Sequence, residues 1–138
     1  MSPASTGYSG TPLAKKLGIK AGTTLLPMGA PDNYLKLLAP LPDDVMLAKR
    51  PSAAVEVVHL FTTQQKDLAK QLASLRKTLK PDAAIWVSWP KKASKVPTDV
   101  TEDMIRAVAL PMGLVDIKVC AVTEVWSGLK LVVRKELR

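Results

Sequence analysis

Two kinds of apolar spacing organise this chain. Residues 54–61 form a nearly continuous run of apolar, β-branched residues, which is typical of a strand covered on both faces, and 83–89 form a second apolar run. Between them, four leucines recur at intervals of four, three and four residues within 64–79 and predict an amphipathic helix. A strand, a helix and a strand in this order predict two parallel strands joined by a right-handed crossover.

Weaker signals extend this unit at both ends. Helices are predicted at 13–17, at 32–38 and from Asp99 or Thr101 to Met112, and short strands at 23–26 and 45–48. The chain closes with a predicted hairpin of strands 115–125 and 129–134, linked by Trp126-Ser127-Gly128. We therefore expect a three-layer α/β fold with a mostly parallel, Rossmann-like sheet that ends in an antiparallel hairpin. A single α/β domain is expected over 11–138, after a flexible N-terminal arm at 1–10.

Composition then excludes several chemistries. The one cysteine, Cys120, cannot form an internal disulfide, and with the one histidine, His59, it cannot complete a tetrahedral zinc site. Both residues lie in predicted strands, where packing explains them. No apolar run is long enough for a membrane span, and residues 1–10 lack the pattern of a secretory signal. We expect a cytoplasmic protein with no membrane partner.

Candidate ligand contacts follow the predicted parallel strands, because ligands of open α/β sheets bind beyond the carboxyl ends of the strands. One glycine follows the first strand, hydroxyl side chains follow the second, and a tryptophan and three lysines follow the third. These candidates are Gly29, Thr62, Trp89, Lys91, Lys92 and Lys95. Each has a structural alternative: a turn for the glycine, a helix cap for the hydroxyl, core packing for the tryptophan and solvation for the lysines.

Known catalytic signatures are missing from the sequence. It contains no Walker-type phosphate loop, no G-x-G-x-x-G after a strand and no G-x-S-x-G nucleophile elbow. We therefore predict no catalytic residue, no cofactor and no metal ligand. The sequence favours a non-catalytic role.

Five short strings together resemble one protein family. They are GYSGTPLAKKLGIK at 7–20, WPKK at 89–92, TDVTE at 98–102, GLVD at 113–116 and WSGLK at 126–130. The chain resembles the small bacterial proteins catalogued as domain of unknown function 3052, a resemblance that spans nearly the whole chain and implies no activity. From residue 54 onward, the order of elements is also similar to the C-terminal half of a class I methyltransferase domain. The glycine-rich motif with which those enzymes bind S-adenosylmethionine has no counterpart at 27–31, which implies a truncated relative.

Charge and the fold similarity together suggest three functions. The chain carries 20 Lys and Arg against 12 Asp and Glu, a net charge of +8, with six basic residues against Asp82 alone between 76 and 95. Our leading hypothesis is a non-catalytic binding or regulatory module that recognises an anionic small molecule or an acidic protein partner near Lys91, Lys92 and Lys95. The alternatives are a degenerate S-adenosylmethionine-dependent transferase and a weak nucleic-acid-binding protein. The last is less favoured, because both halves of the chain carry a similar charge. The oligomeric state is left open.

Overall fold

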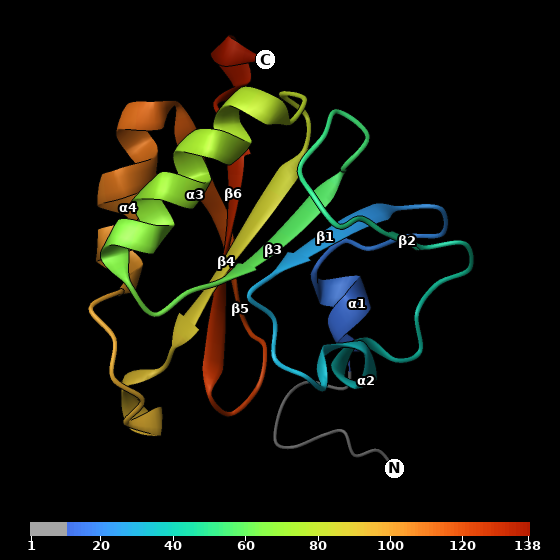
Figure 1. The fold of residues 1–138 in the computed structure, drawn as a ribbon, viewed down its shortest axis with the longest axis horizontal. Helices are drawn as coiled ribbons and strands as arrows, with labels where there is room; N and C mark the ends of the chain where they lie inside the picture. The colour runs from blue at the N-terminus through green and yellow to red at the C-terminus, as the bar shows by residue number, and fades with distance from the viewer. Residues whose placement is uncertain (1–10) are drawn as a thin grey trace.

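A six-stranded sheet forms the centre of the computed structural model, which describes residues 11–138 (Figure 1). The predicted arm at 1–10 lies outside the described residues. The strands are β1 (Thr24–Met28), β2 (Met46–Leu47), β3 (Val57–Phe61), β4 (Ala84–Pro90), β5 (Leu114–Ala121) and β6 (Trp126–Val133). Their order is β2-β1-β3-β4-β6-β5. The first four strands are parallel, whereas β6 runs antiparallel to both β4 and β5. The predicted α/β fold with a mostly parallel sheet and a terminal hairpin is therefore confirmed.

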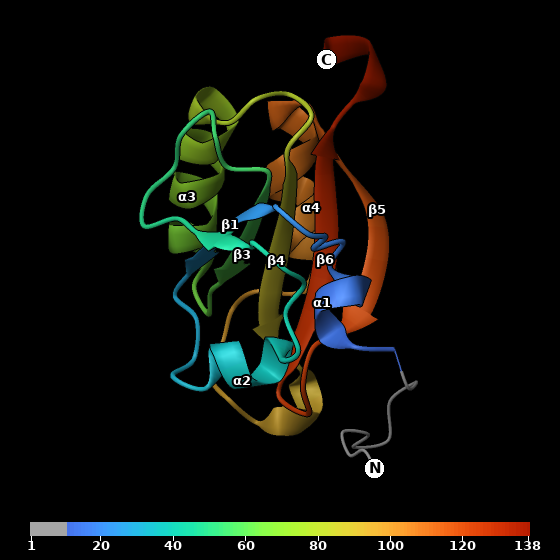
Figure 2. The ribbon, with the colours of Figure 1, turned by 90° about the vertical axis from the view of Figure 1, so that its right-hand side faces the viewer.

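Helices cover both faces of the sheet (Figures 1 and 2). They are α1 (Leu13–Lys16), α2 (Tyr34–Leu38), α3 (Gln65–Thr78) and α4 (Glu102–Ala109), with short 3₁₀ segments η2 (Lys92–Ser94), η3 (Leu110–Met112) and η4 (Lys135–Leu137). One core cluster joins the sheet to α3 and α4, and a second joins it to α1 and α2. This arrangement gives the three layers that the sequence predicts. None of the helices in the described range is long and apolar enough to cross a bilayer.

The apolar run of β3 is explained by this double covering. All five residues of the strand are buried. Val58 and Leu60 belong to the cluster under α3 and α4, whereas Val57 and Phe61 belong to the cluster under α1 and α2. The predicted helix is confirmed as α3, whose Leu68, Leu72 and Leu75 are buried against the first cluster.

The terminal hairpin turns earlier than the sequence predicts. Trp126-Ser127-Gly128 is part of β6, and the turn lies at 122–125, where the Thr123 hydroxyl accepts hydrogen bonds from the amides of Val125 and Trp126. Gly128 lies at a tightly packed position of β6 instead of in the turn: a Cβ there would lie 3.1 Å from the Val122 side chain and 3.3 Å from the Trp86 ring. The predicted turn was wrong because a glycine that admits a neighbouring ring resembles a turn glycine in sequence.

The basic excess at 76–95 is split by the fold. Arg76, Lys77 and Lys80 precede β4, and Lys91, Lys92 and Lys95 follow it. The strand has seven residues and therefore separates the two groups by about 23 Å. The run of basic residues thus forms two surfaces at opposite edges of the sheet.

Candidate ligand-binding site

The strand order reverses between β1 and β3. From β1 the chain passes through α2 to β2 on one side, and it then returns to the other side of β1 to form β3. The helix α3 that follows β3 packs on the opposite face of the sheet from α2. In open α/β sheets, such a switch point opens a crevice at the carboxyl ends of the strands, and ligands bind there.

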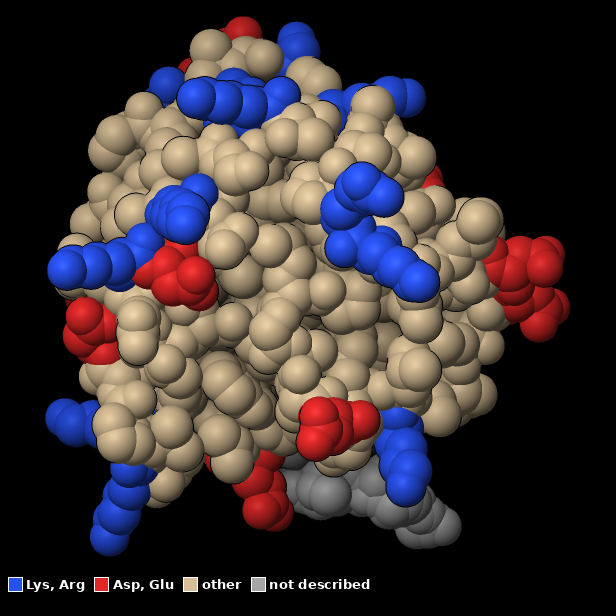
Figure 3. Space-filling view, viewed as in Figure 1, with Lys and Arg blue, Asp and Glu red and all other residues tan. Residues whose placement is uncertain are grey.

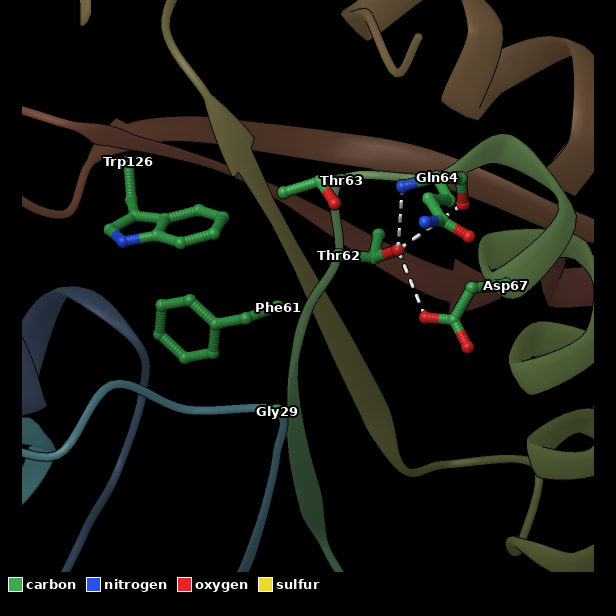
Figure 4. A pocket seen from close by; sticks show the side chains of 7 residues that line it. All are labelled: Gly29, Phe61, Thr62, Thr63, Gln64, Asp67 and Trp126. Carbon is green, nitrogen blue, oxygen red and sulfur yellow. Dashed lines mark hydrogen bonds between the residues drawn. The ribbon is translucent and has the colours of Figure 1, made fainter. Parts of the chain in front are cut away.

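A pocket of about 360 Å³ occupies this crevice (Figure 4). Its lining residues are Gly29, Phe61, Thr62, Thr63, Gln64, Asp67 and Trp126. Gly29 follows β1, the residues from Phe61 to Asp67 join β3 to α3, and Trp126 begins β6. The fold thus brings Gly29 and Thr62, two of the sequence candidates, into one pocket.

Gly29 is held close to the neighbouring strand. Its φ of +67° lies in the left-handed region, and a Cβ at this position would lie 2.7 Å from the carbonyl oxygen of Phe61. A side chain would therefore strain the backbone and also push the loop after β1 away from β3. Gly29 therefore keeps the loop after β1 close to β3 at one side of the pocket.

We expect Gly29→Ala to destabilise the protein more than Gly22→Ala. Gly22 has a φ of +79°, and a Cβ added there would have no atom within 4 Å, so alanine bears only the conformational cost, about 1 kcal/mol. Alanine at Gly29 adds a clash with backbone, which we expect to cost about 2 kcal/mol more. Urea unfolding of both variants measures the difference, and equal costs would contradict the proposed close approach.

Thr62 organises the polar side of the pocket. Its hydroxyl donates to the Asp67 carboxylate at 3.0 Å and accepts from the Gln64 amide at 3.3 Å. In Figure 4 this side chain points toward α3 and away from the aromatic rings. Thr62 therefore forms a turn before α3 and does not cap the helix as expected, because its hydroxyl bonds the amide of the N-cap residue Gln64 and no amide within α3; it also contacts the carboxylate of Asp67.

The direct cap of α3 comes from another part of the chain. The Asp99 carboxylate accepts from the Gln65 amide at 2.6 Å, and the Thr98 hydroxyl donates to the Thr63 carbonyl at 2.7 Å. The cap of α4 is Thr101, whose hydroxyl accepts from the Met104 amide. Of the two caps considered for α4, Thr101 is confirmed, whereas Asp99 caps α3.

Aromatic residues form the other side of the pocket. The Phe61 ring meets Trp126 edge to face at 5.1 Å and stacks on His59 at 4.2 Å. His59 lies behind this wall and is fully buried. Its Nδ1 is 2.8 Å from the Tyr34 hydroxyl, and its Nε2 is 2.7 Å from the Ser88 hydroxyl. The prediction of a packed histidine is confirmed, with two hydrogen bonds where one was expected.

Burial determines the ionisation of this buried network. Desolvation lowers the pKa of His59 from 6.5 to about 3, so the ring is neutral at pH 7. It also raises the pKa of the Tyr34 hydroxyl above its ordinary value. A neutral imidazole has one donor and one acceptor nitrogen, which suits two hydroxyl neighbours. The network therefore supports the pocket wall without carrying charge.

The other sequence candidates lie outside the pocket lining. Trp89 is 8% exposed and packs in the core cluster under α3 and α4. Lys91, Lys92 and Lys95 lie on and around η2. Their loop is nevertheless adjacent to the aromatic wall, because the Lys91 amide donates to the Val125 carbonyl at 2.7 Å, next to Trp126.

Sequence reasoning missed five of the lining residues, which are Phe61, Thr63, Gln64, Asp67 and Trp126. Asp67 was not proposed as a candidate because it lies in the first turn of a predicted helix, and Trp126 was not proposed because it was assigned to a turn. The pairing of β6 with β4 places Trp126 opposite Pro90, at the carboxyl edge of the parallel strands. The presence of a tryptophan beside a predicted hairpin turn was the one sequence feature that could have pointed to Trp126 as a lining residue. Among residues 11–138, no group of three or more His, Cys, Asp or Glu residues could hold a metal ion.

Comparison of the sequence with known families gives one assignment. The family model described as "Protein of unknown function (DUF3052)" matches residues 14–135. The chain belongs to this family. The resemblance drawn from the five sequence strings is thereby confirmed. No curated protein matches this DUF3052 chain.

Solved structures share the fold of this DUF3052 chain. A putative type 11 methyltransferase from Sulfolobus solfataricus aligns with a TM-score of 0.64 at 15% identity, covering 89% of this chain and 90% of the other. A SAM-dependent methyltransferase from Aquifex aeolicus aligns with a TM-score of 0.65 at 19% identity, covering 88% of each chain. The methyltransferase-like fold is confirmed, and the likeness extends beyond the C-terminal half that the sequence indicated.

Proposed function

We propose that this DUF3052 chain is a non-catalytic, small-molecule-binding module whose ligand occupies the pocket between β1, β3 and Trp126. The observation that carries the proposal is the position of this pocket at the switch point of the sheet, where α/β folds bind ligands. Its volume of about 360 Å³ lies within the range of small-molecule sites. The two sides of the pocket fit a ligand that presents an aromatic ring to Trp126, which is backed by the buried Phe61 ring, and hydrogen-bonding groups to the residues at the start of α3.

The chemistry of the lining supports binding instead of catalysis. Asp67 is the one titratable side chain among the lining residues, and it accepts a hydrogen bond from Thr62. His59 lies behind Phe61, and its proton affinity is too low for a general base at neutral pH. Burial also raises the pKa of the Cys120 thiol, which disfavours the nucleophilic thiolate.

An anionic group on the ligand is a further part of the proposal. Lys91, Lys92 and Lys95 lie beyond the Trp126 wall, and their loop is tied to that wall by the hydrogen bond between Lys91 and Val125. A ligand with its ring against Trp126 would place an anionic substituent toward this loop. The pocket therefore supplies the ring contacts, and the loop supplies the charge.

Calorimetric titration of matched ligands tests this proposal. We expect adenosine and ATP to bind the wild type, with ATP binding more tightly, and Trp126→Ala to weaken both by about tenfold through loss of the ring contact. Replacement of Lys91, Lys92 and Lys95 by glutamine should remove the preference for ATP and leave adenosine binding unchanged. Met46→Ala changes an apolar side chain that is 66% exposed on β2, and it serves as the control. Absence of binding by both ligands at millimolar concentration would contradict the proposal.

A degenerate S-adenosylmethionine-dependent transferase is the second candidate. It is favoured by the fold shared with two structures named as methyltransferases. The loop after β1 carries Gly29 as the one glycine between residues 27 and 31, which argues for a reduced cofactor site. S-adenosylmethionine in the same titration distinguishes the two functions. Binding that is tighter than that of adenosine and lost in Trp126→Ala would favour the transferase.

A further inference from the structure

Six basic residues gather at the edge of the molecule opposite the pocket. We call this surface the basic end, and it consists of Arg76, Lys77, Lys80, Arg134, Lys135 and Arg138. Three come from the last turn of α3 and the residues after it, and three come from the segment that follows β6. Figure 3 shows Lys and Arg side chains along the upper edge, over the end of α3 and the C-terminal segment of Figure 1.

Hydrogen bonds hold the two basic segments together around Gly113. The Arg76 Nε donates to the Met112 carbonyl at 3.0 Å, and the Arg134 amide donates to the Gly113 carbonyl at 2.8 Å. The Arg138 Nε donates to the Val133 carbonyl at 2.8 Å. Residues some sixty positions apart in the sequence are thus fixed on one surface. These bonds use Nε and main-chain atoms, and within residues 11–138 no hydrogen bond involves the terminal guanidinium nitrogens of Arg76 and Arg138.

Little negative charge neutralises this surface. The acidic side chains in its two segments are Asp82 and Glu136, against six basic ones. The Glu136 carboxylate lies 3.9 Å from the Arg134 Nε, which is too far for a hydrogen bond, and this buried Nε has no hydrogen-bond partner among the described residues.

Arg106 shows the opposite situation within the same fold. Its guanidinium contacts the carboxylates of Glu102, Asp103 and Asp116, and it holds the pKa of Asp116 below the ordinary value. Arg106 is thus surrounded by three carboxylates, whereas within the described part of the chain the six basic residues of the basic end have one ion pair among them, between Arg134 and Glu136 at 3.9 Å.

We propose that the basic end binds the phosphate backbone of double-stranded nucleic acid. Guanidinium groups form paired hydrogen bonds with phosphate oxygens, and several cations spread over an exposed surface match a repeating row of phosphates. A duplex fits better than a single strand, because no aromatic residue belongs to this surface to stack on bases. The inference is independent of the pocket and goes beyond the proposed function, since β4 separates the two surfaces. The similar charge of the two halves of the sequence argued against nucleic-acid binding. Folding changes this argument, because it brings the basic residues of 76–80 and 134–138 together on one surface.

Matched lysine variants test the location of binding. Lys77→Gln/Lys80→Gln changes two exposed lysines at the basic end, and Lys92→Gln/Lys95→Gln changes two exposed lysines at the pocket edge. Both variants lower the net charge from +8 to +6. Binding to a 20-base-pair duplex of random sequence is measured by fluorescence anisotropy over a series of salt concentrations, with circular dichroism to verify folding. Arg134→Gln/Arg138→Gln repeats the test on the second segment.

We expect the wild type to bind with an affinity that falls steeply with salt. The Lys77/Lys80 variant should bind about tenfold more weakly, and the slope of log K against log salt should fall by about 2, whereas the Lys92/Lys95 variant should change the slope by less than about 0.5. Equal losses in the two variants would overturn the proposal, because net charge alone would then explain binding. Poly-L-glutamate that binds as tightly as the duplex would also overturn it and would favour an acidic protein partner. Absence of duplex binding by the wild type at low salt would refute it directly, whether or not the pocket binds its ligand.

Discussion

Lowering the pH from 7 to 4.5 is expected to remove about 3 kcal/mol of folding stability through His59 alone. The pKa of this residue is about 3 when folded and 6.5 when unfolded. Between these two values the unfolded chain binds the extra proton, so stability falls as the pH falls through this window. Two pH units below 6.5 correspond to about 3 kcal/mol. Protonation is disfavoured because the ring is fully buried, and its two hydrogen-bond partners are neutral hydroxyls that do not offset the charge of an imidazolium as a carboxylate would.

His59→Gln isolates this contribution. Glutamine does not titrate, and we expect the variant to be less stable than the wild type at pH 7 because the hydrogen bonds to Tyr34 and Ser88 are not both replaced. Its further loss between pH 7 and pH 4.5 should be about 3 kcal/mol smaller than that of the wild type. Urea unfolding at the two pH values measures both effects. An identical acid loss in the two proteins would show that His59 is not the group responsible.

Trp86→Ala is expected to cost about 3 to 5 kcal/mol of stability. This side chain is fully buried, and its indole Nε1 donates to the Leu17 carbonyl at 2.9 Å. It thereby ties the segment after α1 to the centre of the sheet, where Gly128 leaves space for the ring. Alanine leaves both a cavity and an unsatisfied buried carbonyl.

Two further variants separate these contributions. Trp86→Phe keeps most of the apolar volume and should cost about 1 to 3 kcal/mol, mainly from the lost hydrogen bond. Trp126→Ala removes the same side chain from a half-buried position and should cost less than Trp86→Ala. Unfolding by urea ranks the three. A ranking in which Trp126→Ala is the most destabilising would contradict the role assigned to Trp86.

The sequence predicted the fold where local and tertiary patterns agree. The apolar run at 54–61 matches the burial of β3 on both faces of the sheet. The leucine spacing at 64–79 matches the burial of α3 along one stripe. The hairpin was misplaced because Gly128 serves the packing of Trp86, a contact 42 positions away that no local pattern encodes. The cap at Asp99 was misassigned for the same reason, since it acts on Gln65, 34 positions earlier.

The candidate site was predictable only for residues that follow parallel strands. Gly29 and Thr62 were found because the carboxyl ends of β1 and β3 meet at one edge. Trp126 reaches that edge from the antiparallel strand β6, whose position beside β4 depends on the sheet order. The local excess of basic residues at 76–95 did not predict a single charged surface. The strand β4 lies between its two basic segments and places them at opposite ends of the molecule.

The loop 91–99 is fastened to both sides of the pocket. At one end the Lys91 amide is bonded to Val125 beside the aromatic wall, and at the other end Asp99 and Thr98 hold the residues that begin α3. The loop therefore connects the two sides of the pocket through hydrogen bonds at both of its ends. A ligand that contacts both Trp126 and the lysines of this loop would therefore meet two surfaces whose spacing is already set before it binds.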